Sequence, residues 1–199
     1  MLVGKFSKGK SYSNSRFNQH GQASAPFELF VAVIIMSFVI VIGYQVLEEV
    51  KKQVCLNSVD KEMTTFKYNL EDTVNRKSST KFLFSPEGDC FSSKGTIMKI
   101  QTETNPKVCD ARCGYPADVC FVMTFMNPKV SNAFKVKCLD LPQYTNFPTE
   151  LCNSGGGDEL TTYTPIDPMN GQLLPGLYAL RNISAAGETY PKVCVYYKP

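Results

Sequence analysis

Cysteines are the residues of this sequence whose type and spacing bear most directly on chemistry. An even number of them after an apolar segment favours disulfides in an oxidising, external compartment. Zinc sites built from cysteine usually contain CxxC pairs, whereas the closest spacing here is CxxxC. We therefore predict disulfides rather than reduced thiols or a zinc site, and spacing alone assigns no pairing. The eight candidates are Cys55, Cys90, Cys109, Cys113, Cys120, Cys138, Cys152 and Cys194.

The single histidine, His20, precedes every cysteine. Chemistry that needs imidazole, such as a Ser-His or Cys-His nucleophile or a histidine-ligated metal, is therefore not expected in the C-terminal region. Cys109 and Cys113 make a poor redox motif, because thioredoxin-type chemistry uses CxxC at a helix N-terminus in a βαβ setting. The aspartates lack EF-hand spacing. We expect no enzyme activity, no catalytic residues, no metal site and no cofactor.

Positive charge is concentrated at the N-terminus. Lys5, Lys8, Lys10 and Arg16 precede the apolar segment and no acidic residue accompanies them. The formal net charge of +3 depends on these four, because the rest of the chain carries 17 of the 21 basic residues against 18 acidic ones. The body of the protein is nearly neutral, so we expect no nucleic-acid partner.

The elements that position the cysteines begin with an apolar stretch at 27–47. Between Leu29 and Leu47 lie 19 residues without a charge, long enough for a single membrane-spanning helix. The basic leader, residues 1–23, is expected on the cytoplasmic side, which places the C-terminal region outside the cell membrane. Lys51 and Lys52 on the far side weaken this orientation, whereas the cysteines agree with it.

The helical pattern continues beyond the apolar stretch, and no proline lies between Phe27 and Arg76. We predict one helix over 24–76, of which residues 27–47 form the transmembrane half and the remainder is amphipathic. Taken from about residue 27 to 74, such a helix is roughly 70 Å long, so its second half must leave the membrane and needs a cover. The alternative is a break near Asn57 and Ser58. The apolar positions of the second half are Val50, Val54, Val59, Met63, Phe66, Leu70 and Val74.

Short β-rich runs separated by turn formers fill residues 77–199, which we predict to form an extracellular head. The fold class is α+β, with an antiparallel, disulfide-stapled sheet packed on the long helix. Alternation in 133–139 puts Lys135 and Lys137 on the opposite face from Phe134, Val136 and Cys138. Cys55 is expected to bond a head cysteine, the alternative being a bond between subunits. The predicted strands are 81–85, 96–102, 119–126, 133–139, 160–163, 176–181 and 192–197.

The stretch Gly21-Gln22-Ala23-Ser24-Ala25-Pro26-Phe27-Glu28 precedes the apolar helix. A basic tail ending in Gly, then Gln-x-Ser, then Glu ahead of such a helix resembles the class III signal region of archaeal type IV pilins. The resemblance implies cleavage by a prepilin peptidase, a helix that packs with those of other subunits in a filament, and a glutamate that neutralises a neighbour's new N-terminal ammonium.

This sequence departs from the pilin pattern in one respect. The pattern sets Gln at the first mature position and Glu at the fifth. A cut after Gly21 makes Gln22 the first residue and Glu28 the seventh, whereas a cut after Ala23 makes Ser24 the first and Glu28 the fifth. Gly21, Gln22, Ala23 and Ser24 are therefore the candidate processing residues, and either cut, or none, fits the sequence.

Glu28 is the candidate assembly residue. Beside a freed α-amine in a medium of low dielectric constant, its carboxylate forms a pair in which each charge compensates the other. The alternative is that Glu28 lies at headgroup level and interacts with the helix dipole.

These features lead us to expect a structural subunit of a surface filament, in contact with the membrane, a prepilin peptidase and other pilin subunits, whose head serves adhesion or contact. The alternatives are a membrane-anchored ectodomain that never polymerises and, less well supported, a membrane-tethered thiol oxidoreductase. Asn182, in the sequon Asn182-Ile183-Ser184, is a candidate glycosylation site.

Overall fold

The computed structural model describes residues 25–86, 90–91, 95–128, 133–152, 160–185 and 187–199. The chain divides into two compact units, of which the first ends at Leu47 and the second comprises Glu48–Pro199. The leader at 1–23 and the candidate processing residues Gly21, Gln22, Ala23 and Ser24 lie outside the described residues.

Helix α1 runs without a break from Ala25 to Arg76. Its polar side chains do not interrupt the backbone pattern, since Ser37 and Thr64 donate their hydroxyls to carbonyls four residues earlier, at 2.8 and 2.7 Å. Lys77, with φ of 53°, takes the left-handed conformation that ends many helices. One continuous helix is confirmed, and the alternative break near Asn57 does not occur.

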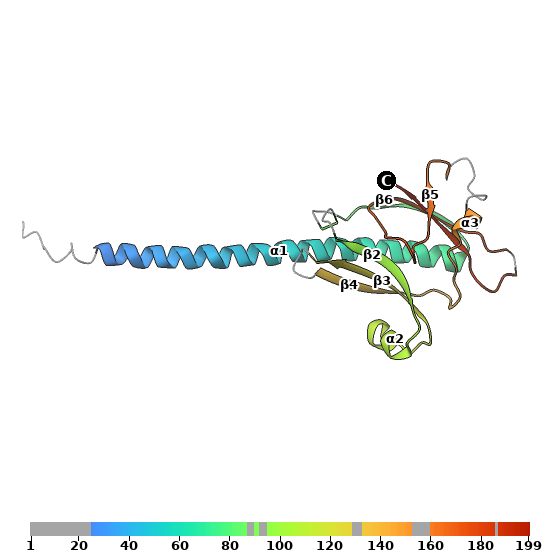
Figure 1. Cartoon of the computed structure of the whole chain (residues 1–199), viewed down its shortest axis with the longest axis horizontal. Helices are drawn as coiled ribbons and strands as arrows, with labels where there is room; N and C mark the ends of the chain where they lie inside the picture. The colour runs from blue at the N-terminus through green and yellow to red at the C-terminus, as the bar shows by residue number, and fades with distance from the viewer. Residues whose placement is uncertain (1–24, 87–89, 92–94, 129–132, 153–159, 186) are drawn as a thin grey trace, which may run out of the picture. The chain divides into compact units, whose positions relative to one another are not determined.

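Two antiparallel sheets form the head, where a single sheet was predicted (Figure 1). The first has the order β1-β6-β7-β5 and the second the order β2-β3-β4. The predicted α+β fold class with a disulfide-stapled β head is confirmed. The strands are β1 (Ser79–Phe84), β2 (Ile97–Glu103), β3 (Cys120–Asn127), β4 (Ala133–Leu139), β5 (Thr164–Ile166), β6 (Gly176–Asn182) and β7 (Val193–Lys198).

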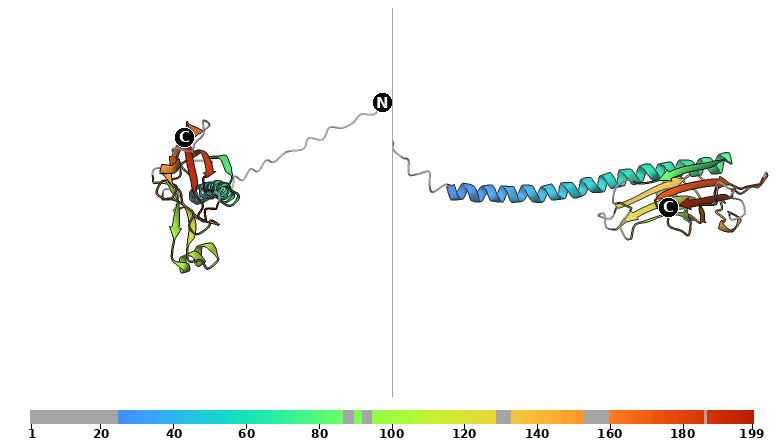
Figure 2. Two further views of the ribbon diagram at one scale, coloured as in Figure 1. Left: turned by 90° about the vertical axis from the view of Figure 1, so that its right-hand side faces the viewer. Right: turned by 90° about the horizontal axis from the view of Figure 1, so that it is seen from above.

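The second half of α1 packs one face against the strands and leaves the other face exposed (Figure 2). Val50 and Val54 do not belong to the buried face, contrary to prediction, because they are 49% and 58% exposed. The buried stripe starts instead at Cys55, which the sequence pattern did not count as a packing position. Its members are Cys55, Val59, Met63, Phe66, Leu70 and Val74.

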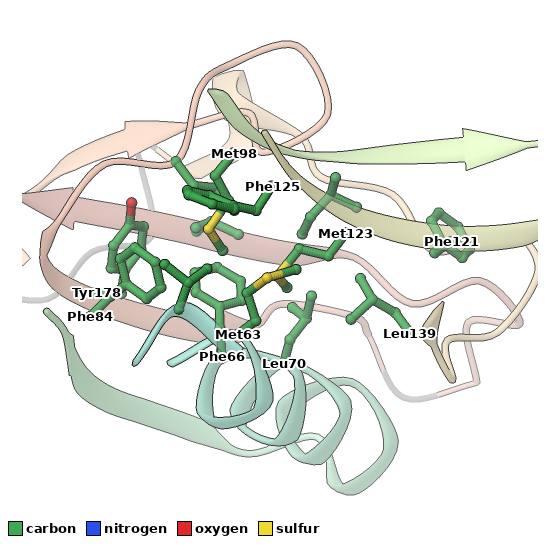
Figure 3. Packing of buried hydrophobic residues seen from close by; sticks show 14 of the residues in the cluster. Met63, Phe66, Leu70, Phe84, Met98, Phe121, Met123, Phe125, Leu139 and Tyr178 are labelled. Atoms are coloured by element: carbon green, nitrogen blue, oxygen red, sulfur yellow. The ribbon is translucent and has the colours of Figure 1, made fainter. Parts of the chain in front are cut away.

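Phe66 lies at the centre of an aromatic cluster between α1 and the first sheet (Figure 3). Its ring meets those of Phe82 and Tyr178 edge-on, each at a centroid distance of 5.2 Å. The Tyr178 hydroxyl is buried but satisfied, because it donates to the Leu174 carbonyl at 2.7 Å and accepts from the Leu174 N–H at 2.9 Å. Burial raises the pKa of Tyr178, so the phenol is neutral at physiological pH.

The lysine face of β4 lies toward α1. Lys137 Nζ is 3.0 Å from an Asp60 carboxylate oxygen, and Lys135 Nζ is 3.8 Å from the other. The opposite face carries Phe134, which is exposed, and Cys138. The alternation was therefore predicted correctly, and Asp60 explains why two lysines face a packed helix.

The prediction of a strand at 160–163 is wrong. Residues 160–162 form a turn in which the Tyr163 N–H donates to the Leu160 carbonyl at 3.0 Å, and β5 begins one residue later. Leu160 and Tyr163 instead pack on the outer face of the first sheet, against the cluster that contains Cys152 and Cys194. Apolar residues at a turn can satisfy a strand pattern without pairing.

Two short helices, α2 (Pro106–Cys113) and α3 (Thr149–Cys152), were not predicted. In α2, the Asn105 side chain caps the N-terminus by accepting from the Lys107 N–H at 3.1 Å, and Pro106 occupies the first turn. Gly114 closes the helix in the left-handed conformation, with φ of 75°. From the sequence, Asn105 and Pro106 were interpreted as turn formers, because helix caps and turns favour the same residue types.

Candidate functional site

The first candidate site is the apolar surface of α1. Every residue from 26 to 50 is exposed, so its apolar side chains surround the helix on all sides. Within the described ranges, α1 is the one helix long and apolar enough to cross a membrane. A side chain exposed in this way needs a lipid or protein partner, since an apolar patch of this extent is unusual in a soluble monomer. The helix is consistent with single-pass anchoring.

Glu28 is the acidic residue of the first turn of α1, and it is exposed. Its carboxylate makes no hydrogen bond or ion pair with the part of the chain that the structure describes. The position suits an interaction with the helix dipole, and it equally leaves the carboxylate accessible to a cation of another molecule. Gly43, further along, has no atom within 4 Å of where a Cβ would lie, so a second helix can approach it closely.

The second candidate feature is the disulfide framework, in which all eight cysteines are paired. Cys55–Cys90 ties α1 to the segment between β1 and β2, which agrees with the predicted bond within one chain. Cross-links of this kind lower the conformational entropy of the unfolded chain and so stabilise the folded one, and the effect is larger for longer loops. The other pairs are Cys109–Cys120, Cys113–Cys138 and Cys152–Cys194, with Cα–Cα distances of 5.8, 5.4 and 5.5 Å.

Cys109 and Cys113 are not bonded to each other. Each fastens α2 to a different strand, Cys109 through Cys120 of β3 and Cys113 through Cys138 of β4. Cys109 and Cys120 are also buried. A dithiol catalyst needs one accessible pair that opens and closes, so this arrangement gives the CxxxC motif a structural role.

The third candidate, Asn182, lies at the C-terminal end of α1. Its Nδ2 donates to the carbonyls of Thr73 and Val74 at 3.2 and 3.1 Å, and its Oδ1 accepts from the Ser184 N–H at 2.9 Å. These carbonyls belong to the last turn of the helix, which lacks backbone partners. Glycosylation stays a prediction, but a glycan would replace a hydrogen on the nitrogen that caps α1.

We predict that Asn182→Asp lowers the unfolding free energy of the head by about 1–3 kcal/mol. Asp keeps the acceptor for the Ser184 N–H but has no N–H to donate, so the Thr73 and Val74 carbonyls lose their partner. Chemical denaturation monitored by circular dichroism measures the change. Both chains are produced in a host without N-glycosylation, and Asn57→Asp, the same exchange at an exposed position of α1, is the control; equal stability of Asn182→Asp and the native chain contradicts the capping role.

No group of three or more metal-ligating side chains gathers anywhere in the described ranges. Asp167 illustrates what the turn aspartates do instead, because its Oδ1 accepts from the Met169 N–H at 2.8 Å. The carboxylate thus closes a turn.

Two exposed groups on the head were not found from the sequence. Tyr144 and Tyr190 lie in edge-to-face contact, with ring centroids 4.9 Å apart. Ile97, Met126 and Phe134 are exposed and directly opposite one another across β2, β3 and β4, forming one apolar row. A row of three side chains is within the ordinary range for a monomer surface. No sequence signal brings either group together, because both depend on how separate strands or loops meet in the fold.

No protein-family model matches this chain, and searches of curated proteins and of solved structures find no similar protein.

Proposed function

We propose that this protein is a structural subunit of a type IV pilin-like surface filament of the archaeal kind. Its N-terminal helices pack together to form the filament, and its head faces outward for adhesion or contact. The proposal contains no catalytic step and no cofactor. Its partners are the membrane, a prepilin peptidase and further copies of the same chain.

The observation that carries the proposal is that α1 is both an exposed apolar helix and part of the head's core. The first part of the helix has exposed apolar side chains on all sides, and the same unbroken helix supplies the buried stripe from Cys55 to Val74. A plain anchor needs only a spanning segment attached to a domain. In this chain the exposed apolar residues and the buried stripe belong to one helix, so packing of α1 with other helices and packing of the head involve the same element.

Glu28 supplies the second support. A carboxylate at the start of an apolar helix is costly unless it has a partner, and none lies within the described chain. The ammonium of a cleaved neighbouring subunit is such a partner. This pairing requires that the leader is removed, because only cleavage creates an N-terminus near the first turn of α1.

The orientation that the proposal requires is N-terminus inside and C-terminus outside. The leader's four basic residues favour it by the positive-inside tendency. Four disulfides in the head also favour it, because such bonds persist in external compartments. After assembly, the head lies on an extracellular filament.

Mass spectrometry of the mature N-terminus tests the proposal. We expect the chain isolated from its native cell surface to begin at Gln22 or Ser24, since both cuts leave α1 intact. The two products differ by the mass of two residues, so one spectrum identifies the register. Electron microscopy of the same preparation should show filaments.

An intact leader together with dispersed single chains would refute the filament and leave the membrane-anchored ectodomain as the function. Substituting the residue that precedes each cut, Gly21→Leu with Ala23→Leu, is the control for specific cleavage. In that double variant the leader should remain attached and filaments should be absent.

A further inference from the structure

Tyr144 and Tyr190 stand out among the aromatic residues of the head. The two side chains are 59% and 53% exposed, whereas the rings of the core cluster around Phe66 are largely buried. Their rings meet at an interplanar angle of 75°. Two large rings that contact each other and still expose more than half of their surface can act as a binding surface for a ligand.

Main-chain hydrogen bonds hold the two tyrosine segments together. The Asn146 N–H donates to the Pro191 carbonyl at 2.9 Å, and the Val193 N–H donates to the Asn146 carbonyl at 2.9 Å. The Cys152–Cys194 disulfide joins the same two segments a few residues further on. The backbone segments that carry the two rings are therefore held together before any ligand arrives, which lowers the entropic cost of binding.

The tyrosine pair lies at the end of the head where α1 terminates. The connection from β6 to β7, which carries Tyr190, starts at Asn182, and the Asn182 amide contacts the last turn of α1. Cys55, where α1 enters the core, lies at the other end of the buried stripe. Within the head, the pair therefore lies beside the last turn of α1 and not beside Cys55.

The surroundings of the pair are hydrophilic and carry charges of both signs. Gln143 and Thr189, which precede the two tyrosines, are exposed. The charges nearest to Tyr190 in the sequence compensate each other, because Lys192 Nζ is 2.6 Å from a Glu188 carboxylate oxygen. The charge nearest to Tyr144 in the sequence is the exposed Asp140. The hydrogen bond from Lys192 lowers the pKa of Glu188, so this carboxylate stays charged at neutral pH. The site thus favours neither an anion nor a cation.

The size and geometry of the pair limit the classes of ligand that it can bind. Stable protein interfaces bury about 800 Å² per partner, more than two tyrosine side chains provide. Proline-rich peptides dock into grooves between aromatic rings, and here the rings touch, leaving no such groove. A sugar ring instead presents polarised C–H groups to the electron-rich face of one aromatic ring, and its hydroxyls bond to neighbouring amides and hydroxyls.

We propose that Tyr144 and Tyr190 form a binding platform for a neutral oligosaccharide. This inference rests on the proposed function for the outward placement of the head, and it gives the adhesive contact a chemical class. The binding itself requires neither cleavage nor filament formation.

Titration of the full chain in lipid nanodiscs tests the platform, since glycoside detergents would compete for it. Maltohexaose, cellohexaose and chitohexaose are added separately, and saturation-transfer NMR measures the dissociation constant. We expect at least one of them to bind at millimolar concentration or below, and Tyr144→Ala and Tyr190→Ala each to weaken that binding by roughly tenfold. Tyr144→Phe keeps the ring and should stay within about twofold of the native chain.

Tyr115→Ala is the matched control, because Tyr115 is 41% exposed and makes no ring contact with the described aromatic residues. It should leave binding unchanged. The platform is refuted if none of the three sugars binds at about 10 mM, or if binding survives both alanine variants. Decaproline that binds through both tyrosines, without sugar binding, would assign the pair to a peptide. Since single, unassembled chains are titrated, failure here leaves the filament proposal standing.

Discussion

Glu28→Gln is expected to abolish filament formation while the chain still inserts in the membrane and folds its head. Gln has the shape of Glu without its charge, and Glu28 is exposed in the first turn of α1. Removing one member of an ion pair in a medium of low dielectric constant leaves the other charge uncompensated, at about 3–5 kcal/mol. A loss of about 3 kcal/mol per contact weakens association by over a hundredfold.

Electron microscopy of surface filaments, together with membrane fractionation of the same cells, measures this outcome. Glu28→Asp, which keeps the charge on a shorter side chain, should retain part of the assembly. Glu48→Gln is the matched control, because Glu48 is an exposed acid at the other end of the apolar run and has no assigned role in pairing. Its filaments should be normal.

The helix-dipole interpretation of Glu28 predicts a different result. An acid in the first turn contributes about 0.3–1 kcal/mol to a helix. Its loss would lower stability slightly and leave assembly intact. Filaments of normal number and length in Glu28→Gln would therefore reject the charge pair and favour the dipole.

The long helix was predictable because its signals are local and repeat over many turns. Phe66 and Leu70 recur at the helical period, and no proline interrupts the pattern. The start of the buried stripe was not predictable from periodicity, since Val50 and Val54 fit the same period as Val59. What distinguishes them is the Cys55–Cys90 bond, which marks where the head begins to cover α1.

Properties that depend on distant segments could not be predicted. Disulfide pairing and the division into two sheets depend on the tertiary arrangement, which composition and turn signals do not encode. The Asp60 contact with Lys137 joins positions 77 residues apart. The cap that Asn182 forms on α1 was missed for the same reason. In the sequence Asn182 was interpreted only as part of a sequon, and its contacts with Thr73 and Val74 depend on the fold.

Among the candidate site residues, some could likewise be selected from the sequence and others could not. Glu28 and the cysteines could be selected because their chemistry is unusual for their position, an acid beside an apolar run and thiols in an even number. Tyr144 and Tyr190 are ordinary residues 46 positions apart, and only folding gives them their contact. Sites built from common residues across loops leave no local pattern to detect.

Phe66→Ala is expected to destabilise the head by about 3–5 kcal/mol, the range for removing a large buried side chain. Phe66 is fully buried on α1, with Phe82 and Tyr178 at centroid distances of 5.2 Å and Phe84 at 6.1 Å. The substitution leaves a cavity that these rings cannot all fill, and it removes their edge-to-face contacts as well. Chemical denaturation followed by near-ultraviolet circular dichroism reports the change, because Tyr178 contributes to the signal.

Tyr68→Ala is the matched control, since Tyr68 lies two residues later on the same helix and is 64% exposed. Removing an exposed ring should change stability by less than about 0.5 kcal/mol. Equal losses in the two variants would mean that the α1 face carrying Phe66 does not anchor the head. If Phe66→Ala alone is costly, the head depends for its stability on the same helix that we propose assembles the filament.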